Sequence, residues 1–223
     1  APFVEGMDMS NEAFPHMSVR ECTFMGVPCR LFRMTFAGEL GFEINVPANY
    51  GKAVWDALFA HGAPMGLTPY GTEAMHILRA EKGYIIVGQD TDGTVTPQDA
   101  GLSWAIAKSK PDFVGIRGLK RVDLVAEGRK QLVGLKTKDP KTVLEEGAQI
   151  VLDPNQPIPM KMVGHVTSSY WSENCGRSIA MALIEGGFNK MGQTVYIPMP
   201  GRTIEAEICD AVFYDKEGGR INV

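Results

Sequence analysis

The sequence of 223 residues predicts an α+β fold, with strands and helices mixed over residues 1–127 and a small, nearly all-β domain over residues 128–223. Three observations predict this fold. Both strand-like alternation and helical spacing of apolar residues occur before Glu127. From Lys130 onward the apolar runs are short, β-rich and separated by Asp-Pro, Gly-Gly and Pro-Gly turns. The hydrophobic share of 44% and the charged share of 22% suit a chain with a packed core.

The first predicted elements are strands. Residues Ser18 to Thr35 alternate Val, Thr, Phe and Leu with Arg and Glu, which predicts two strands joined around Met25-Gly26-Val27. A short third strand follows from Phe42 to Val46. Alternation along this strand places Glu43 on the face opposite to Phe42 and Ile44.

Two helices are predicted next. Apolar residues recur at helical spacing between Tyr50 and His61, where Asn49 can cap the start and Gly62 the end. A second helix is predicted from about Thr72 to Lys82, and Gly83 can close it.

The rest of the first region is predicted to be loop, apart from one short helix around Gly115 to Val125. Residues Gly88 to Gly101 are polar and rich in Gly, Asp and Thr, as loops are. The following region supplies short predicted strands whose spacing favours a β-barrel or sandwich: QLVGLKT, AQIVL, KMVGHVTSSYW, RSIAMALI, TVYIPM and TIEAEICDAVF. We place the boundary between the two regions near Glu127 to Lys130.

Charge and hydropathy exclude several function classes. The net charge of −4 and the pI near 5.6 argue against a nucleic-acid partner. No apolar run approaches the ~20 residues that a membrane helix needs, so no membrane association is predicted. The sequence also carries neither a G-x-G-x-x-G nor a G-x-x-x-x-G-K-S/T phosphate-binding motif.

No metal site is predicted. The cysteines form no CxxC pair, and the histidines follow no HxxxH or HExxH spacing. The segment Asp90 to Thr94 resembles the start of a calcium loop, but Gly101 stands where an acidic ligand is needed. We interpret it as a loop whose Asp and Thr side chains bond their own backbone, with a loop bordering a ligand site as the alternative. The cysteines are expected to be reduced thiols, although Cys22 and Cys29 could face each other across a hairpin turning at Gly26.

Two charged residues have both a plain and a functional interpretation. Glu43 is either an ordinary solvent-exposed carboxylate or one aimed into a pocket, where it could accept two parallel hydrogen bonds from an amidine-like edge such as that of a pterin. Arg79 is either solvated or an anion clamp, with Lys82 adding positive potential. Trp104 is interpreted as core packing.

Five segments resemble the aminomethyltransferase family, the folate-dependent T-protein of glycine cleavage, in the same order and over most of the chain. Thr35 to Ile44 resembles its T-G-Y-T-G-E-x-G-F-E-I signature, and Leu78 to Gly83 its R-x-E-x-G helix. Thr96 to Trp104 is similar to its T-P-x-x-A-G-L-x-W stretch. Lys130 to Leu135 and Gly164 to Ser168 resemble its C-terminal β-domain, so the resemblance implies a partial folate-binding domain followed by a β-barrel.

Other segments resemble the alpha-subunit family of heterotetrameric sarcosine oxidases more specifically. These are Thr68 to His76, Glu81 to Thr94, Val166 to Ser172 and Val212 to Asp215. The resemblance implies an enzyme, an oxidoreductase acting on CH–NH groups, whose folate module captures the one-carbon unit of oxidised sarcosine as 5,10-methylenetetrahydrofolate. FAD, FMN and NAD are expected elsewhere in the complex, together with beta, gamma and delta subunits and an N-terminal part of the same subunit. The expected location is the cytoplasm.

The resemblance also implies roles for residues. Glu43 corresponds to the family glutamate that holds the pterin, and Arg79 to the arginine that steadies the benzoyl-glutamate end of folate. Phe36 stands where the family has a tyrosine, so a hydroxyl contact to folate is lost. The family's catalytic aspartate lies upstream of this signature, and Asp8 does not stand in its context. The isolated chain is therefore expected to be inactive.

Alternatives stay open at this point. The chain could belong to a stand-alone aminomethyltransferase or a folate-dependent demethylase, or be a non-catalytic interaction module with this fold. The absence of an initiator Met before Ala1 is expected to reflect truncation of a longer chain.

Overall fold

The computed structural model describes residues 3–222 and divides into two compact units. Unit 1 comprises residues 1–78 and 217–223, and unit 2 comprises residues 79–216. Each unit is built around its own hydrophobic clusters. Among the described residues, no helix is both long and apolar enough to cross a membrane.

Unit 1 contains a three-stranded antiparallel sheet in the order β1-β2-β3. Its strands are β1 (Ser18–Phe24), β2 (Val27–Arg33) and β3 (Glu43–Asn45), which confirms the predicted strands with slightly shorter ends. Met25 and Gly26 both have positive φ values, 53° and 76°, as a tight two-residue hairpin turn requires. This turn fixes the register that pairs Phe24 with Val27.

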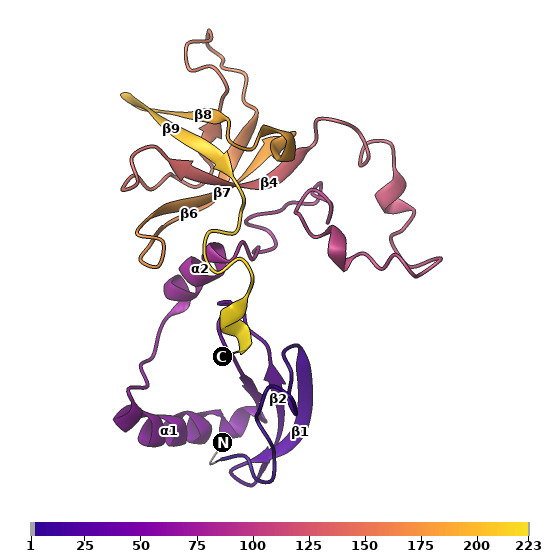
Figure 1. The fold of residues 1–223 in the computed structure, drawn as a ribbon, viewed down its shortest axis with the longest axis vertical. Coiled ribbons are helices and arrows are strands. Elements are labelled where there is room, and N and C mark those ends of the chain that lie inside the picture. The colour runs from indigo at the N-terminus through magenta and orange to yellow at the C-terminus, as the bar shows by residue number, and fades with distance from the viewer. Residues whose placement is uncertain (1–2, 223) are drawn as a thin grey trace. The chain divides into compact units, whose positions relative to one another are not determined.

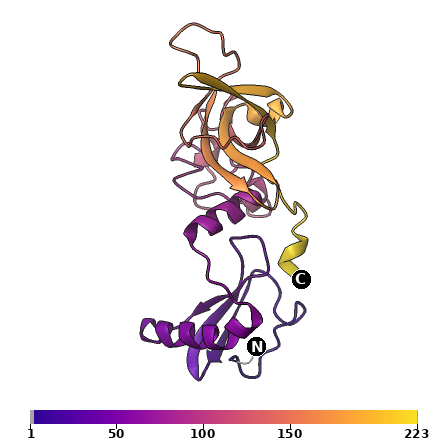
Figure 2. The same cartoon turned by 90° about the vertical axis from the view of Figure 1, so that its left-hand side faces the viewer.

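One face of this sheet is covered by helix α1 (Gly51–Gly62), which lies across the strands in Figure 2. Val54 and Leu58 of α1 join Leu31 and Ile44 of the sheet in one apolar cluster. The helix is held because alternation along β2 and β3 sends these apolar side chains to the same face. Residues at the intervening positions, including Glu43, lie on the opposite face of the sheet.

The predicted caps of α1 are wrong. Asn49 lies inside a 3₁₀ turn, and Tyr50 occupies the N-cap position without a side-chain hydrogen bond. At the other end Gly62 is still helical, and the chain enters the left-handed region only at Gly66, with a φ of 84°. Asn49 suggests an N-cap because it is polar and stands before the helical pattern, but the 3₁₀ turn Ala48–Tyr50 already contains it and moves the N-cap to Tyr50.

Helix α2 (Thr72–Glu81) confirms the second predicted helix, and Gly83 follows it with a φ of 67°. A Cβ at Gly83 would lie 2.9 Å from the carbonyl oxygen of Ala211, so a larger residue would clash with backbone there. The last turn of α2 therefore packs closely on the segment that follows the barrel. Further short helices are 3₁₀ turns: Ala48–Tyr50, Ala63–Met65, Ser103–Ala105, Gly118–Lys120, Gly187–Lys190 and Gly219–Asn222.

Unit 2 contains a six-stranded antiparallel sheet in the order β5-β6-β7-β4-β9-β8 (Figure 1). The backbones of Val151 and Tyr196 exchange two hydrogen bonds of 2.9 and 3.0 Å, which join its two edges and close the sheet into a barrel. The predicted strands are confirmed: β4 (Lys130–Thr137), β5 (Gln149–Ile150), β6 (Gly164–Ser172), β7 (Arg177–Glu185), β8 (Thr194–Met199) and β9 (Arg202–Cys209).

The barrel interior is filled by aliphatic side chains from all the long strands, among them Leu135, Val166, Ile197 and Ile208. The neighbouring strands β6 and β7 approach closely at Gly164, where a Cβ would lie 2.2 Å from the carbonyl oxygen of Leu183. Only glycine fits at that position, which is the first residue of the G-H-V-T-S segment.

The stretch from residue 86 to residue 128 has no regular strand or α-helix. The predicted loop Gly88 to Gly101 is confirmed, but the predicted helix around Gly115 to Val125 is wrong, since only the 3₁₀ turn Gly118–Lys120 forms there. Val114 and Val122 are among the most exposed apolar side chains, so no packing surface stabilises a helix here.

The two compact units divide between residues 78 and 79, whereas the predicted domain boundary lies at residues 127/128. Residues 79–127 group with the barrel, because the end of α2 and the loop after it are bonded to barrel strands. The barrel strands themselves begin at Lys130. The domain boundary at 127/128 stays a prediction.

Candidate functional site

In unit 1, strand β3 presents Glu43 on the open face of the sheet. Glu43 pairs with Phe32 in the β2–β3 register, while the adjacent Ile44 packs in the core. The Glu43 side chain is exposed, and among the described residues its carboxylate makes no hydrogen bond or ion pair. A carboxylate in this state has both oxygens available to accept hydrogen bonds from a ligand.

The loop between β2 and β3 folds tightly upon itself. The backbone N–H of Gly38 donates to Thr35 Oγ1 at 3.0 Å, and Gly38 has a φ of 74°. A Cβ at Gly41 would lie 2.7 Å from the carbonyl oxygen of Met34, so this glycine is required by close backbone approach. The loop carries Phe36, whose ring is partly exposed. The backbone conformation of the loop thus explains the two glycines of this part of the signature, Gly38 and Gly41.

Arg33, at the end of β2, is a buried cation that the sequence did not indicate. Its side chain is 1% exposed, and its guanidinium donates to the carbonyl oxygen of Phe14 at 2.7 Å and to Asn11 Oδ1. The ring of Phe42 lies 5.8 Å from the guanidinium carbon. No carboxylate of the described residues lies within ion-pair distance of Arg33, and its Nε has no partner there.

In unit 2, Arg79 is fully buried, at 0% exposure, which makes the solvated interpretation wrong. Its Nη1 donates to Asp90 Oδ2 and to the carbonyl oxygen of Tyr84, the latter at 3.1 Å. Its Nη2 donates to Ser168 Oγ at 2.8 Å and to the hydroxyl of Tyr170 at 3.2 Å. Whether Arg79 contacts folate stays a prediction, and the structure shows that its guanidinium is already engaged.

Asp90 is the counter-charge of Arg79 and accepts further hydrogen bonds. They come from the backbone N–H of Ile86 at 2.9 Å, from Thr167 Oγ1 at 2.6 Å and from Ser168 Oγ at 2.6 Å. With four donors around one buried carboxylate, the charge is compensated in the way that burial requires.

A β-bulge explains how two consecutive side chains reach the same carboxylate. The register of β6 against β7 shifts between Val166 and Ser168, which leaves Thr167 as the extra residue. In a regular strand, Thr167 and Ser168 would point to opposite faces, whereas a bulge re-aims one of them. The G-H-V-T-S segment therefore supplies the hydroxyls that hold Asp90.

The two aspartates of the loop after α2, Asp90 and Asp92, have different hydrogen-bond partners. Asp92 accepts from the backbone and hydroxyl of Thr94 at 2.7 and 2.6 Å, and these bonds hold the pKa of Asp92 below its ordinary value. This part confirms the predicted self-bonded loop. Asp90, two residues earlier, bonds instead to β6, and nothing in the local pattern distinguishes the two aspartates.

The other charged residues of the R-x-E-x-G segment are also bonded within unit 2. Glu81 accepts from Ser172 Oγ at 2.6 Å and from Asn174 Nδ2 at 2.8 Å. Lys82 Nζ pairs with Asp215, so the positive charge predicted to assist an anion clamp is neutralised locally. The segment that looks like a ligand motif in the sequence is, in this unit, the joint between helix and barrel.

Trp104 is 80% exposed, so the prediction that it packs in the core is wrong within the part of the chain that the structure describes. It borders a hollow of about 570 Å³ together with Leu102, Phe188 and Met191. The nearby Thr96–Asp99 turn is bonded to Arg129, whose guanidinium donates to Asp99. Among residues 3–222, no group of three or more His, Cys, Asp or Glu side chains could hold a metal ion.

Comparison with known families accounts for this architecture. The chain matches the "GCVT N-terminal domain" over residues 1–110 and the "Glycine cleavage T-protein C-terminal barrel domain" over residues 130–215. The chain belongs to the glycine cleavage T-protein family. A crystal structure of the glycine cleavage system aminomethyltransferase T from Bartonella henselae shares the fold, with a TM-score of 0.72, 24% identity, and coverage of 84% of this chain and 50% of that one.

Among curated proteins, the resemblance to sarcosine oxidase alpha subunits is confirmed. The chain is 46% identical, over 99% of its length, to sarcosine oxidase subunit alpha of Corynebacterium sp. (strain P-1), and 37% identical over 97% to that of Rhizobium meliloti (strain 1021). It spans 23% and 22% of those relatives. It is 31% identical, over 86% of its length, to an aminomethyltransferase of Desulforamulus reducens, of which it spans 50%.

Proposed function

We propose that this chain is the folate-binding, T-protein-like module of a sarcosine oxidase alpha subunit. The observation that carries this proposal is the 46% identity over 99% of the chain to a protein of that name. Identity to proteins named aminomethyltransferase is lower, at 31%. The difference favours the oxidase over a stand-alone aminomethyltransferase or a folate-dependent demethylase.

The proposed reaction is tetrahydrofolate-dependent capture of the one-carbon unit of oxidised sarcosine, which gives 5,10-methylenetetrahydrofolate. The module's part in it is to hold the pterin in position, because fixed orientation removes much of the barrier to joining two molecules. Glu43 suits this task, since its exposed carboxylate is unpaired among the described residues and can accept the paired donors of the pterin edge. Phe36 offers a ring where the family has tyrosine.

Arg79 is proposed to steady the anionic benzoyl-glutamate end of folate. Its two terminal nitrogens already donate to four acceptors, so a folate carboxylate would have to replace one of them. Tyr170 holds the longest of these bonds, at 3.2 Å, and is the partner most easily exchanged. If Arg79 binds an anion in this way, the affinity for a polyglutamylated folate falls as ionic strength rises. An affinity independent of salt contradicts the clamp.

The catalytic aspartate of the family is proposed to lie upstream of this chain, which supplies no catalytic residue of its own. We therefore expect no methylene transfer by the isolated chain. Formaldehyde and tetrahydrofolate are incubated with the chain, and the methylene product is followed against the uncatalysed rate. Product formed faster than in the blank contradicts the assignment.

The full complex is proposed to carry FAD, FMN and NAD outside this chain, with beta, gamma and delta subunits as partners, in the cytoplasm. The open reading frame that encodes the chain distinguishes a sarcosine oxidase alpha subunit from a stand-alone aminomethyltransferase or folate-dependent demethylase, because the oxidase requires a long upstream dinucleotide-binding segment. Calorimetric titration of the full-length protein with tetrahydrofolate separates both from a non-catalytic interaction module, which would release no binding heat.

A further inference from the structure

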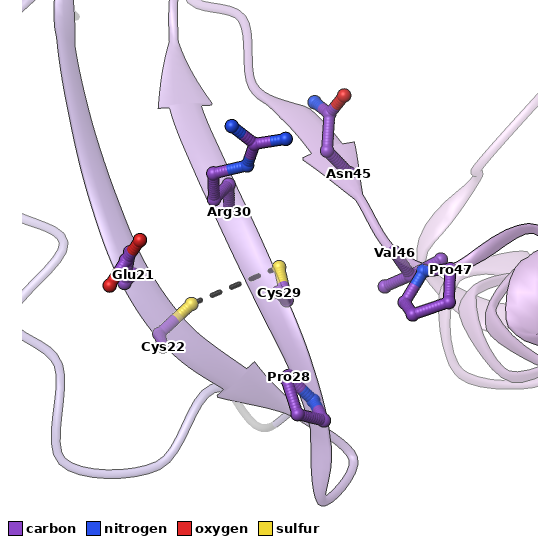
Figure 3. Close-up of a pocket in the computed structure, with 8 residues that line it drawn as sticks. All are labelled: Glu21, Cys22, Pro28, Cys29, Arg30, Asn45, Val46 and Pro47. Carbon is purple, nitrogen blue, oxygen red and sulfur yellow. Dashed lines mark hydrogen bonds between the residues drawn. The ribbon is translucent and has the colours of Figure 1, made fainter.

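The β1–β2 hairpin places two cysteines directly opposite each other. Cys22 pairs with Cys29 in the register, and their sulfur atoms lie 3.9 Å apart (Figure 3). Facing residues of an antiparallel pair have Cα atoms about 4.5 or 5.5 Å apart, and both spacings lie within the range that a disulfide spans. The register therefore places the two cysteines within reach of a disulfide, provided that the sulfur atoms move from 3.9 Å to bonding distance.

The two thiols differ in access. Cys29 is buried in the core cluster of unit 1, whereas Cys22 is half-buried at its border. Both line a hollow of about 540 Å³ that also touches Glu21 and Arg30, and Figure 3 shows the two sulfur atoms turned toward each other between the strands. A small oxidant can therefore reach Cys22 first.

We propose that Cys22 and Cys29 form a cross-strand dithiol site that hydrogen peroxide converts reversibly to a disulfide. In the first step the Cys22 sulfur attacks one peroxide oxygen, the O–O bond breaks, and Cys22 sulfenic acid and water form. In the second step the Cys29 sulfur attacks the Cys22 sulfur, and the hydroxyl group leaves as a second water with the thiol proton. Two thiols are oxidised and one peroxide is reduced.

The order of the two steps follows from the environment of Cys29. Burial and the neighbouring Cys22 thiol raise the pKa of Cys29 to about 11, so Cys29 stays protonated near neutral pH. Only the thiolate is a good nucleophile, so a protonated thiol reacts poorly with free peroxide. Its attack on the Cys22 sulfenic acid is intramolecular, because the two sulfur atoms lie 3.9 Å apart, and this proximity offsets the small thiolate fraction. Cys22 is therefore the residue that is oxidised first.

The chain offers a direct test, because cleavage after Arg20 and Arg30 yields one peptide, Glu21 to Arg30, that holds both cysteines. The intact protein is treated with hydrogen peroxide, alkylated and digested with trypsin, and the masses of the peptides are measured by mass spectrometry. We expect this peptide to lose two hydrogen atoms and to take up no alkylating group, and dithiothreitol to restore two alkylated cysteines. Cys175→Ser is the matched control and should leave this result unchanged.

The variants separate the two roles. Cys29→Ser should leave a sulfenic acid at Cys22 that a dimedone probe labels, and Cys22→Ser should leave Cys29 reduced. The proposal is overturned if the peptide stays doubly alkylated under peroxide, if Cys22 proceeds to sulfinic acid without the cross-link, or if Cys29 is labelled by dimedone in place of Cys22. The wild-type measurement alone decides the cross-link, even where a variant fails to fold.

Discussion

Two arginines, one in each unit, are almost completely buried, and they are compensated in different ways. Arg79 in unit 2 faces the carboxylate of Asp90, which hydroxyl and backbone donors also hold. Arg33 in unit 1 has only a backbone carbonyl, an amide oxygen and an aromatic ring among the described residues. Within the described part of the chain, unit 2 thus contains the counter-charge of its buried arginine, whereas unit 1 compensates its buried arginine with neutral acceptors.

The largest effect is expected for Arg79→Met. This substitution leaves the buried Asp90 carboxylate without its cation, and loss of one partner of a buried ion pair costs about 3–5 kcal/mol. We expect unit 2 to unfold at a correspondingly lower urea concentration, and hydrogen exchange of the barrel amides measures this unfolding. Lys138→Met, which breaks an exposed ion pair with Glu205, is the control and should unfold like the wild type. Equal unfolding of the two variants would show that the buried pair does not hold the joint.

The next effect tests whether neutral acceptors suffice for a buried guanidinium. Asp90→Asn keeps an oxygen acceptor but removes the counter-charge, which makes Arg79 resemble Arg33. We expect a smaller loss of about 2–3 kcal/mol, the worth of a hydrogen bond to a charged group with its desolvation cost. The same urea series measures it. A loss as large as that of Arg79→Met would show that the charge, and not the hydrogen bonds, decides.

Arg33→Met is expected to cost less again, because no buried carboxylate is left behind. The carbonyl oxygen of Phe14 and the amide oxygen of Asn11 lose a donor, which costs about 1–2 kcal/mol. Hydrogen exchange of the Phe24 amide in β1 and of the Leu31 amide in β2 reports this change locally. If Arg33→Met destabilises unit 1 as strongly as Arg79→Met destabilises unit 2, an anionic partner of Arg33 has been missed.

The smallest effect is a pH dependence at the Asp99–Arg129 pair. Burial raises the pKa of Asp99, but hydrogen bonds from Arg129 and Thr96 outweigh it, so the net pKa lies below the ordinary value. A lowered pKa contributes stability above the unfolded-state value, near 4, and this contribution is lost as pH falls through the folded-state pKa. The stability gap between wild type and Asp99→Asn should therefore be present at pH 7 and close on acidification. A gap that widens in acid contradicts the sign.

Much of the fold could be predicted from the sequence because its signals are local. Alternation alone gives β1, β2 and β3 and places Glu43 on the face opposite to Ile44, and short β-rich runs give the barrel strands. The two-residue turn at Met25-Gly26 also fixes the opposition of Cys22 and Cys29. The predicted caps of α1 were wrong, and at the N-terminal end the reason is that a 3₁₀ turn precedes the helix. The predicted helix around Gly115 to Val125 was wrong because no packing surface supports a helix there.

The state of Arg79 could not be predicted, because its partners are distant in the sequence. Ser168 lies 89 residues away, and a β-bulge at Thr167 decides which hydroxyls reach Asp90. Helical spacing sets Arg79 apart from the apolar face of α2, but it does not show that barrel strands bury that side as well. Arg33 was missed for the same reason, since nothing near it in the sequence marks a buried cation.

The central claim is that Glu43 holds the pterin of tetrahydrofolate. The most direct test is calorimetric titration of the full-length protein and its Glu43→Gln variant with tetrahydrofolate, beside Glu21→Gln, a matched change on the same open face of the sheet. Loss of a charged, paired acceptor should weaken binding by about 10- to 100-fold, whereas Glu21→Gln should leave the affinity unchanged. Unchanged affinity in Glu43→Gln, or equal weakening in both variants, would contradict the account.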